Sequence, residues 1–193
     1  MPFLTAPVVP AGTLAGMPQP TLDPGDGLLL RPWLDSDAPA VHEAFQDPLI
    51  HRWHLRAAES VAEVREWIGE WISDWVEEDS AQWAVVAADG GRLLGRVALR
   101  ELRLDEGVAE VAYWTTAAAR GQGVAARAAT ALSRWALDDI GLQRLELLHS
   151  VANEGSCRVA ARSGFRLEGT KRRSGLHTDG WHDMHLHARV RGD

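Results

Sequence analysis

The stretch AEVAYWTTAAARGQGVAARAATAL, residues 109–132, predicts a strand, a glycine-containing loop and a helix in direct succession. Apolar residues predict the strand over 108–114. The helix is predicted over 121–138, because one face would carry Val124, Ala128, Ala131, Leu132 and Trp135. The loop at 120–125 therefore lies at the start of the helix.

This loop has the features of a phosphate site. The first turn of a helix leaves backbone N–H groups without partners, and the helix dipole adds positive potential there. Gly121 and Gly123 allow close backbone approach, Ala125 is small, and Arg120 could add a cation. Taken alone, the segment could equally be a tight turn. It lacks the lysine of a Walker loop and the spacing of a dinucleotide fingerprint.

Outward from this stretch, further strands and helices alternate. The patterns predict helices over 35–45 (capped by Asp35-Ser36-Asp37), 60–77 and 154–162, the last ended by Gly164. They predict strands over 28–33, 82–88, 92–102, 145–151, 165–169 and 181–190, with a hairpin turn at Asp89-Gly90-Gly91. The tryptophans at 67, 71 and 75 are expected in the core rather than on a binding platform. The alternation favours a partly parallel sheet covered by helices.

The first 26 residues differ from the rest of the 193-residue chain. They hold six of its nine prolines and show no apolar period. We expect an arm at 1–26 that packs loosely or contacts a neighbouring subunit, or else a poorly ordered tail. One domain is expected over 27–190, followed by a short tail at 191–193.

Composition narrows the classes of function. The net charge of −7 argues against nucleic acid as the main partner. No apolar run is long enough to span a membrane, and the N-terminus shows no secretion signal. The single cysteine, Cys157, excludes an internal disulfide and suits a reducing compartment, so a cytoplasmic location is expected.

Four separated segments resemble the GNAT superfamily of acyltransferases. Arg120, Gly123 and Ala125 match its pyrophosphate loop, Arg/Gln-x-x-Gly-x-Gly/Ala, and residues 109–114 resemble its fourth strand. Residues 153–165 resemble its Asn-x-x-Ser…Gly-Phe segment. Similarity to the branch that acetylates ribosomal-protein N-termini lies in Asp47-Pro48, Arg52-Trp53 and Trp181-His182-Asp183-Met184.

The resemblance covers about 27–190 and implies a fold. It implies a single α/β (α+β) domain with a mixed sheet of six to seven strands, splayed after the fourth strand and flanked by about four helices. It also implies an N-acyltransferase that moves an acetyl or other acyl group from acyl-CoA to a primary amine by direct attack. The acceptor would be a small-molecule amine or a protein N-terminus, and a homodimer is expected.

The resemblance also assigns the cofactor site. Trp114 and Thr115 would hold the pantetheine arm at the splayed end of the fourth strand. Asn153 would bond the pantetheine or an ordered water, although it could simply cap its helix. The pyrophosphate would lie on the loop formed by Arg120, Gly121, Gln122, Gly123, Val124 and Ala125.

The catalytic roles are assigned to two residues. Glu110 is predicted as the base, with a purely structural role as an even alternative. The tyrosine that many members use as the acid is replaced here by Ala160, and Tyr113, the only tyrosine, is expected elsewhere. Ser156 is therefore predicted as the acid, or else as a local helix cap. Acceptor binding is expected at Trp53 and His54, together with Glu110.

Three alternatives remain. Cys157 as a nucleophile would need a base partner that the sequence does not identify. His185 and His187 share a strand face with His182 nearby, but no cysteine or carboxylate pattern completes a metal site, so no metal is expected. The missing tyrosine motivates a non-catalytic acyl-CoA-binding sensor or scaffold as the other function.

Overall fold

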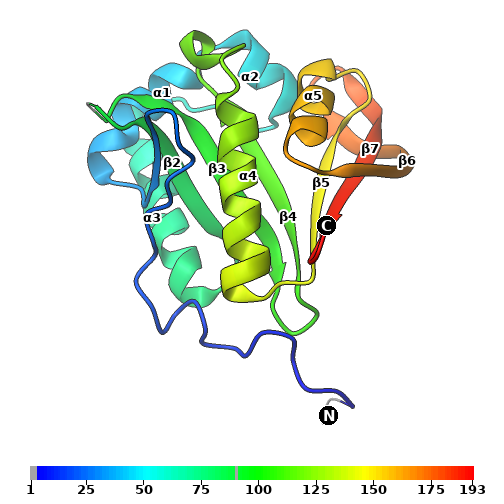
Figure 1. Cartoon of the computed structure of the whole chain (residues 1–193). Helices are drawn as coiled ribbons and strands as arrows, with labels where there is room; N and C mark the ends of the chain where they lie inside the picture. The colour runs from blue at the N-terminus through cyan, green and yellow to red at the C-terminus, as the bar shows by residue number, and fades with distance from the viewer. Residues whose placement is uncertain (1–3, 90) are drawn as a thin grey trace.

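A seven-stranded sheet forms the centre of the computed structural model, which describes residues 4–89 and 91–193 (Figure 1). Its spatial order is β1-β2-β3-β4-β5-β7-β6. β4 and β5 pair in parallel, and the other neighbours are antiparallel, which confirms the predicted mixed sheet. The strands are Leu28–Arg31 (β1), Ala81–Ala87 (β2), Leu93–Arg103 (β3), Val108–Thr115 (β4), Arg144–Ser150 (β5), Arg166–His177 (β6) and Gly180–Val190 (β7).

The sheet splays between β4 and β5, as predicted. Their parallel pairing ends where Glu110 faces Glu146, although the strands continue to Thr115 and Ser150. Beyond this point β4 is still paired with β3 on its other side. The second half of β4 thus keeps its backbone groups on the β5 side free of a strand partner.

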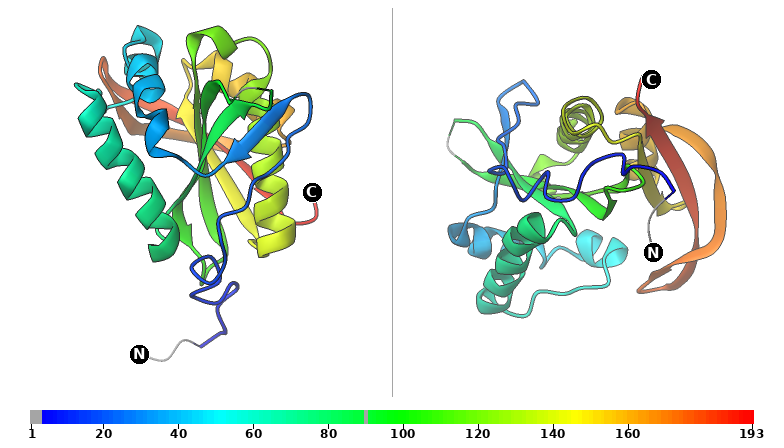
Figure 2. Two further views of the ribbon diagram at one scale, coloured as in Figure 1. Left: turned by 90° about the vertical axis from the view of Figure 1, so that its left-hand side faces the viewer. Right: turned by 90° about the horizontal axis from the view of Figure 1, so that it is seen from below.

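Helices cover both faces of the sheet, and Figure 2 shows α3 and α4 on opposite sides. The tryptophans of α3 are 5–7% exposed, which confirms that they belong to the core. Ser60 caps α3 by accepting a hydrogen bond from the Glu63 amide. The helices are Ala38–Ala44 (α1), Pro48–Trp53 (α2), Val61–Glu77 (α3), Val124–Arg134 (α4) and Glu154–Arg162 (α5).

Some predicted boundaries differ from the observed ones. The sequence pattern missed α2, a short helix that starts because Asp47 accepts from the Leu49 amide and Pro48 occupies the first turn. β6 was predicted to end at 169 but runs to His177, because its mostly exposed polar residues pair with β7 without an apolar pattern. β2 and β3 form the predicted hairpin, although Gly90 of the turn lies outside the described residues.

The described part of the N-terminal arm lies against the domain. Val9 and Leu14 are 2% and 1% exposed and belong to the main core, whereas residues 4–8 are exposed. The Glu78 carboxylate accepts hydrogen bonds from three arm amides, those of Gly12, Leu14 and Ala15. In the part of the chain that the structure describes, no helix has both the length and the apolar character needed to cross a membrane.

Candidate active site

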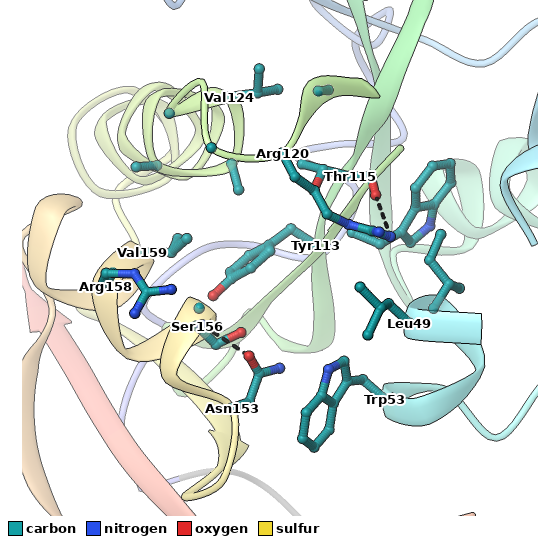
Figure 3. A pocket seen from close by; sticks show the side chains of 18 of the residues that line it. Leu49, Trp53, Tyr113, Thr115, Arg120, Val124, Asn153, Ser156, Arg158 and Val159 are labelled. Carbon is teal, nitrogen blue, oxygen red and sulfur yellow. Dashed lines mark hydrogen bonds between the residues drawn. The ribbon is translucent and has the colours of Figure 1, made fainter. Parts of the chain in front are cut away.

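A cavity of about 430 Å³ lies between α2, the end of β4 and the first turns of α4 and α5 (Figure 3). Most of the predicted site residues line it, namely Trp53, His54, Trp114, Thr115, Arg120, Gly121, Gly123, Val124, Ala125, Asn153 and Ser156. Glu110 and Gln122 are not among its lining residues. The fold therefore brings together segments that are widely separated in the sequence.

The loop before α4 presents its backbone to this cavity. Gly121 and Gly123 have φ of 77° and 75°, in the left-handed region that favours glycine, and a Cβ at either would meet nothing within 4 Å. The first bond of α4 runs from the Arg127 amide to the Gly123 carbonyl. The amides of Val124 and Ala125 precede that bond. An anion can therefore approach free N–H groups at the positive end of the helix dipole.

Two polar side chains of the loop, those of Arg120 and Gln122, already have partners within the protein. The Gln122 amide donates to the Ala118 carbonyl at 2.6 Å, so only its backbone is available to a ligand. Arg120 forms an ion pair with Asp47 at 2.6 Å, at the start of α2. Burial raises the pKa of the Asp47 carboxyl, whereas hydrogen bonds from the Leu49 amide and Arg120 lower it. The lowering effects together are larger, so the pKa of Asp47 lies below its usual value. The ion pair thus fastens α2, which carries Trp53 and His54, to the loop.

The Asp47→Asn variant is expected to lower kcat/KM of the acyl transfer that the resemblance implies by about tenfold. Asparagine can still cap α2, so the change removes the charge while keeping the helix. The pair is half-buried, so its loss should cost about 1–2 kcal/mol, between typical surface and buried values. Steady-state kinetics measures this effect. Asp35→Asn, which breaks an exposed ion pair with Arg65, is the control, and an equal loss in both variants would contradict the positioning role.

Tyr113 is a site residue that the sequence interpretation placed elsewhere. It lines the cavity, and its hydroxyl points toward α5 and Ser156 (Figure 3). Burial raises its pKa to about 12, so the phenol stays protonated at neutral pH. The sequence contained one signal for this position, since Tyr113 directly precedes the predicted pantetheine-binding Trp114. A proton donor is therefore present near Ser156 without the missing helix tyrosine.

The first turn of α5 brings Asn153 and Ser156 to the cavity. The Asn153 side-chain oxygen accepts from the Ser156 amide at 3.1 Å, so Asn153 caps the helix. Ser156 does not fill that role, and its hydroxyl faces the cavity beside Tyr113. Asn153 can cap α5 and still offer its side-chain N–H groups to a ligand.

Glu110 lies at the last β4–β5 pair before the splay. Its carboxylate forms an ion pair with Arg100 at 2.7 Å, and the Glu110 side chain is 15% exposed. Burial raises the pKa of Glu110 above its usual value, and the charge of Arg100 opposes this without cancelling it. Burial and the nearby charges of Arg96 and Arg100 lower the pKa of His54 to about 4. His54 is thus a neutral imidazole at the cavity wall. The charge of Arg100 lowers the pKa of both His54 and Glu110.

The histidines predicted on β7 have different partners. The sequence shows no cysteine or carboxylate pattern that completes a site with His185 and His187, but the fold places Cys157 and His149 beside them. The reason is topological: α5 crosses over β5 and β7, which the sequence pattern does not show. His182 instead contacts Ser150 at 2.7 Å and Asp179 at 2.8 Å.

The comparisons with known proteins agree with this geometry. A family model described as "Acetyltransferase (GNAT) domain" matches residues 27–166. The chain is 35% identical over 92 residues to the putative ribosomal N-acetyltransferase YdaF of Bacillus subtilis, covering 48% of this chain and 50% of that protein. It is 31% identical over 98 residues to the ribosomal-protein-serine acetyltransferase of Escherichia coli, covering 51% and 55%. The chain thus spans about half the length of these two curated relatives.

Solved structures share the fold. The ribosomal L7/L12 alpha-N-protein acetyltransferase RimL, solved in complex with coenzyme A, superposes with a TM-score of 0.82 at 20% identity. The superposition covers 89% of this chain and 98% of the other. At this identity the likeness shows the fold alone.

Proposed function

Since the chain belongs to the GNAT acetyltransferase family, we propose that it transfers an acetyl group from acetyl-CoA to the primary amine of a protein N-terminus. The observation that carries this proposal is the cavity at the splay. It joins an unpaired strand edge, a helix start with free amides and two proton donors. These are the elements that acyl transfer from a long phosphorylated thioester requires.

Two parts of the cavity suit two parts of such a thioester, the pyrophosphate and the amide-containing arm. The free amides before Arg127 suit the pyrophosphate, because two left-handed glycines open space in front of them. The β4 edge at Trp114 and Thr115 suits an extended amide-containing arm, because its backbone groups lack a partner on the β5 side. The remaining lining residues, from α2 and α5, bound the end of the cavity where the reacting carbonyl would lie.

In the proposed reaction the amine attacks the thioester carbonyl directly. Glu110 would remove the ammonium proton through water, because it is not among the residues that line the cavity. Neutral His54 would form a hydrogen bond with the incoming amine. The carbon–sulfur bond then breaks, and Ser156 would donate a proton to the leaving thiolate with Tyr113 behind it. The donor pair supports an enzyme over a non-catalytic binding module, because the missing helix tyrosine was the reason for that alternative.

The proposal for the acceptor rests on the end of the cavity that α2 forms. Trp53 on α2 packs edge-on against His177 and His182 of the β6–β7 hairpin, at centroid distances of 5.5 and 6.2 Å. This contact closes the space between α2 and the hairpin, so an acceptor would approach beside it, along the Trp53 and His54 wall of the cavity. The names of the two curated relatives support a ribosomal-protein N-terminus. The homodimer, the cytoplasmic location and a reaction without metal stay predictions.

The proposal is tested by coenzyme A release from acetyl-CoA with a panel of amines. The panel contains peptides with N-terminal Ala, Ser or Met, free amino acids and a polyamine. We expect turnover with peptides, and mass spectrometry should place the acetyl group on the α-amine. The same peptides with blocked N-termini are the control. No turnover above hydrolysis with any amine, in protein that binds acetyl-CoA, would contradict the proposal.

The Glu110→Gln variant is expected to lower kcat/KM about 100-fold, as removal of a general base typically does. The base must be ionised, so wild-type activity should fall as the pH drops through the raised pKa of Glu110, and the variant should lack this step. Rates from pH 5 to 9 measure this effect. Glu106→Gln, at an exposed carboxylate that is paired with Arg103, is the control. An unchanged rate and profile would exclude Glu110 as the base.

A further inference from the structure

Three histidines and the only cysteine meet beneath α5, outside the cavity. His149 lies on β5, His185 and His187 lie on β7, and Cys157 lies on α5. Since His149 pairs with His185 across the two strands, and His187 is two residues further along β7, the three imidazoles share one face of the sheet. In Figure 1, α5 lies against the upper ends of these two strands. The helix places the thiol on the same face, next to the imidazoles.

The distances are close to those of a tetrahedral metal site. Nε2 of His149 lies 3.1 Å from Nε2 of His187, and Sγ of Cys157 lies 3.5 Å from Nδ1 of His185. One ligand atom from each of the four residues lies within 4.8 Å of all the others. With Zn–N of about 2.0 Å and Zn–S of about 2.3 Å, ligand atoms of a tetrahedron lie about 3.3–3.6 Å apart. The two shortest pairs are near these values, and the longest pairs would close by about 1 Å.

A neighbouring hydrogen bond orients one of the rings. Nδ1 of His149 lies 2.8 Å from the Ser150 carbonyl, which can only accept, so this nitrogen carries the proton. Nε2 of His149 is then unprotonated and faces the cluster. A carbonyl on the far nitrogen is the usual support of a metal-binding histidine. His149 and His187 are 5% and 6% exposed, so water does not surround them.

We propose that His149, Cys157, His185 and His187 bind one zinc ion. Three imidazoles and a thiolate suit zinc far better than magnesium or calcium, which prefer oxygen ligands. Four protein ligands leave no open position, so the ion would be structural. Its effect would be to fasten α5 to β5 and β7. Because α5 carries Asn153 and Ser156 into the cavity, the ion would hold these two side chains in place.

The test is metal binding by the chelator-treated full chain, with zinc or cobalt alone as the probe. We expect one ion per chain by elemental analysis. We also expect cobalt to show the visible bands of a tetrahedral ion and a near-ultraviolet thiolate band, both displaced by zinc. Cys157→Ser should lose the thiolate band. Its zinc affinity should fall at least about 100-fold, the upper range for loss of an outer-shell partner.

Control variants separate this site from other histidines. His42→Gln, on α1, should bind metal as the wild type does, and His187→Gln should bind at least about 100-fold more weakly. Zinc should raise the Tm of the wild type and not that of Cys157→Ser. Less than one ion per chain, or equal binding by wild type and Cys157→Ser, would show that the cluster is only a set of hydrogen-bonded side chains. The wild-type stoichiometry and spectrum decide this even if a variant fails to fold, and neither depends on acetyl transfer.

Discussion

Replacing Ala125 with glutamate is expected to raise the KM for acetyl-CoA at least about 100-fold while the protein stays folded. Ala125 lies in the first turn of α4 and lines the cavity. A carboxylate there favours the helix, because it interacts with the positive end of the dipole. It would also occupy the site proposed for the pyrophosphate. Two unit charges about 4 Å apart repel by about 4 kcal/mol at an effective dielectric of 20, which exceeds a 100-fold loss.

The measurement combines steady-state kinetics with calorimetric titration of coenzyme A, and the Tm shows that the fold is kept. Ala125→Gln is the matched control, since it has the same shape without the charge. We expect its KM to rise far less than that of Ala125→Glu. Equal effects of the two variants would point to steric blocking, and an unchanged KM in Ala125→Glu would place the pyrophosphate elsewhere.

The Ser156→Ala variant is expected to lower the rate of the chemical step about 100-fold, the usual range for loss of a positioned acid. Tyr113→Phe should lower it about tenfold, because its hydroxyl points toward Ser156 and would assist the same proton transfer. Since the two groups would act as one unit, the double variant should be little worse than Ser156→Ala. Single-turnover acetylation of a peptide measures the step without product release.

Ser156→Thr is the control for this pair, because it keeps a hydroxyl and should retain most of the rate. The KM for acetyl-CoA should change little in all four variants. If Tyr113→Phe loses the rate and Ser156→Ala does not, Tyr113 is the donor. Full rates in both single variants would mean that water protonates the thiolate.

Much of the fold was predictable because it depends on local patterns. Residue patterns located six strands and the first part of β6, and the capping residues before α3 and α5 located the starts of those helices. Segments without such patterns were missed or shortened. α2 is too short to show a period, and the second half of β6 is polar because its hairpin with β7 is largely exposed.

The candidate site divides in the same way. The glycine loop was predictable because its chemistry comes from consecutive residues: two left-handed glycines and the free amides of the helix that follows. The Arg120–Asp47 ion pair was not, because its partners lie on segments that meet only when α2 packs beside the loop. The sequence predicted Arg120 as a phosphate ligand, which stays a prediction, and tertiary packing places the Asp47 carboxylate beside it.

The sequence by itself thus determined the family, the sheet with its flanking helices and the backbone cradle before α4. Only the tertiary structure brought Tyr113 beside Ser156, and Cys157 beside three histidines. The physical reason is that a strand or helix pattern determines which face a side chain occupies, whereas its partner depends on how the elements cross. Here the splay of β4 from β5 and the crossing of α5 over β5 and β7 decide both pairings.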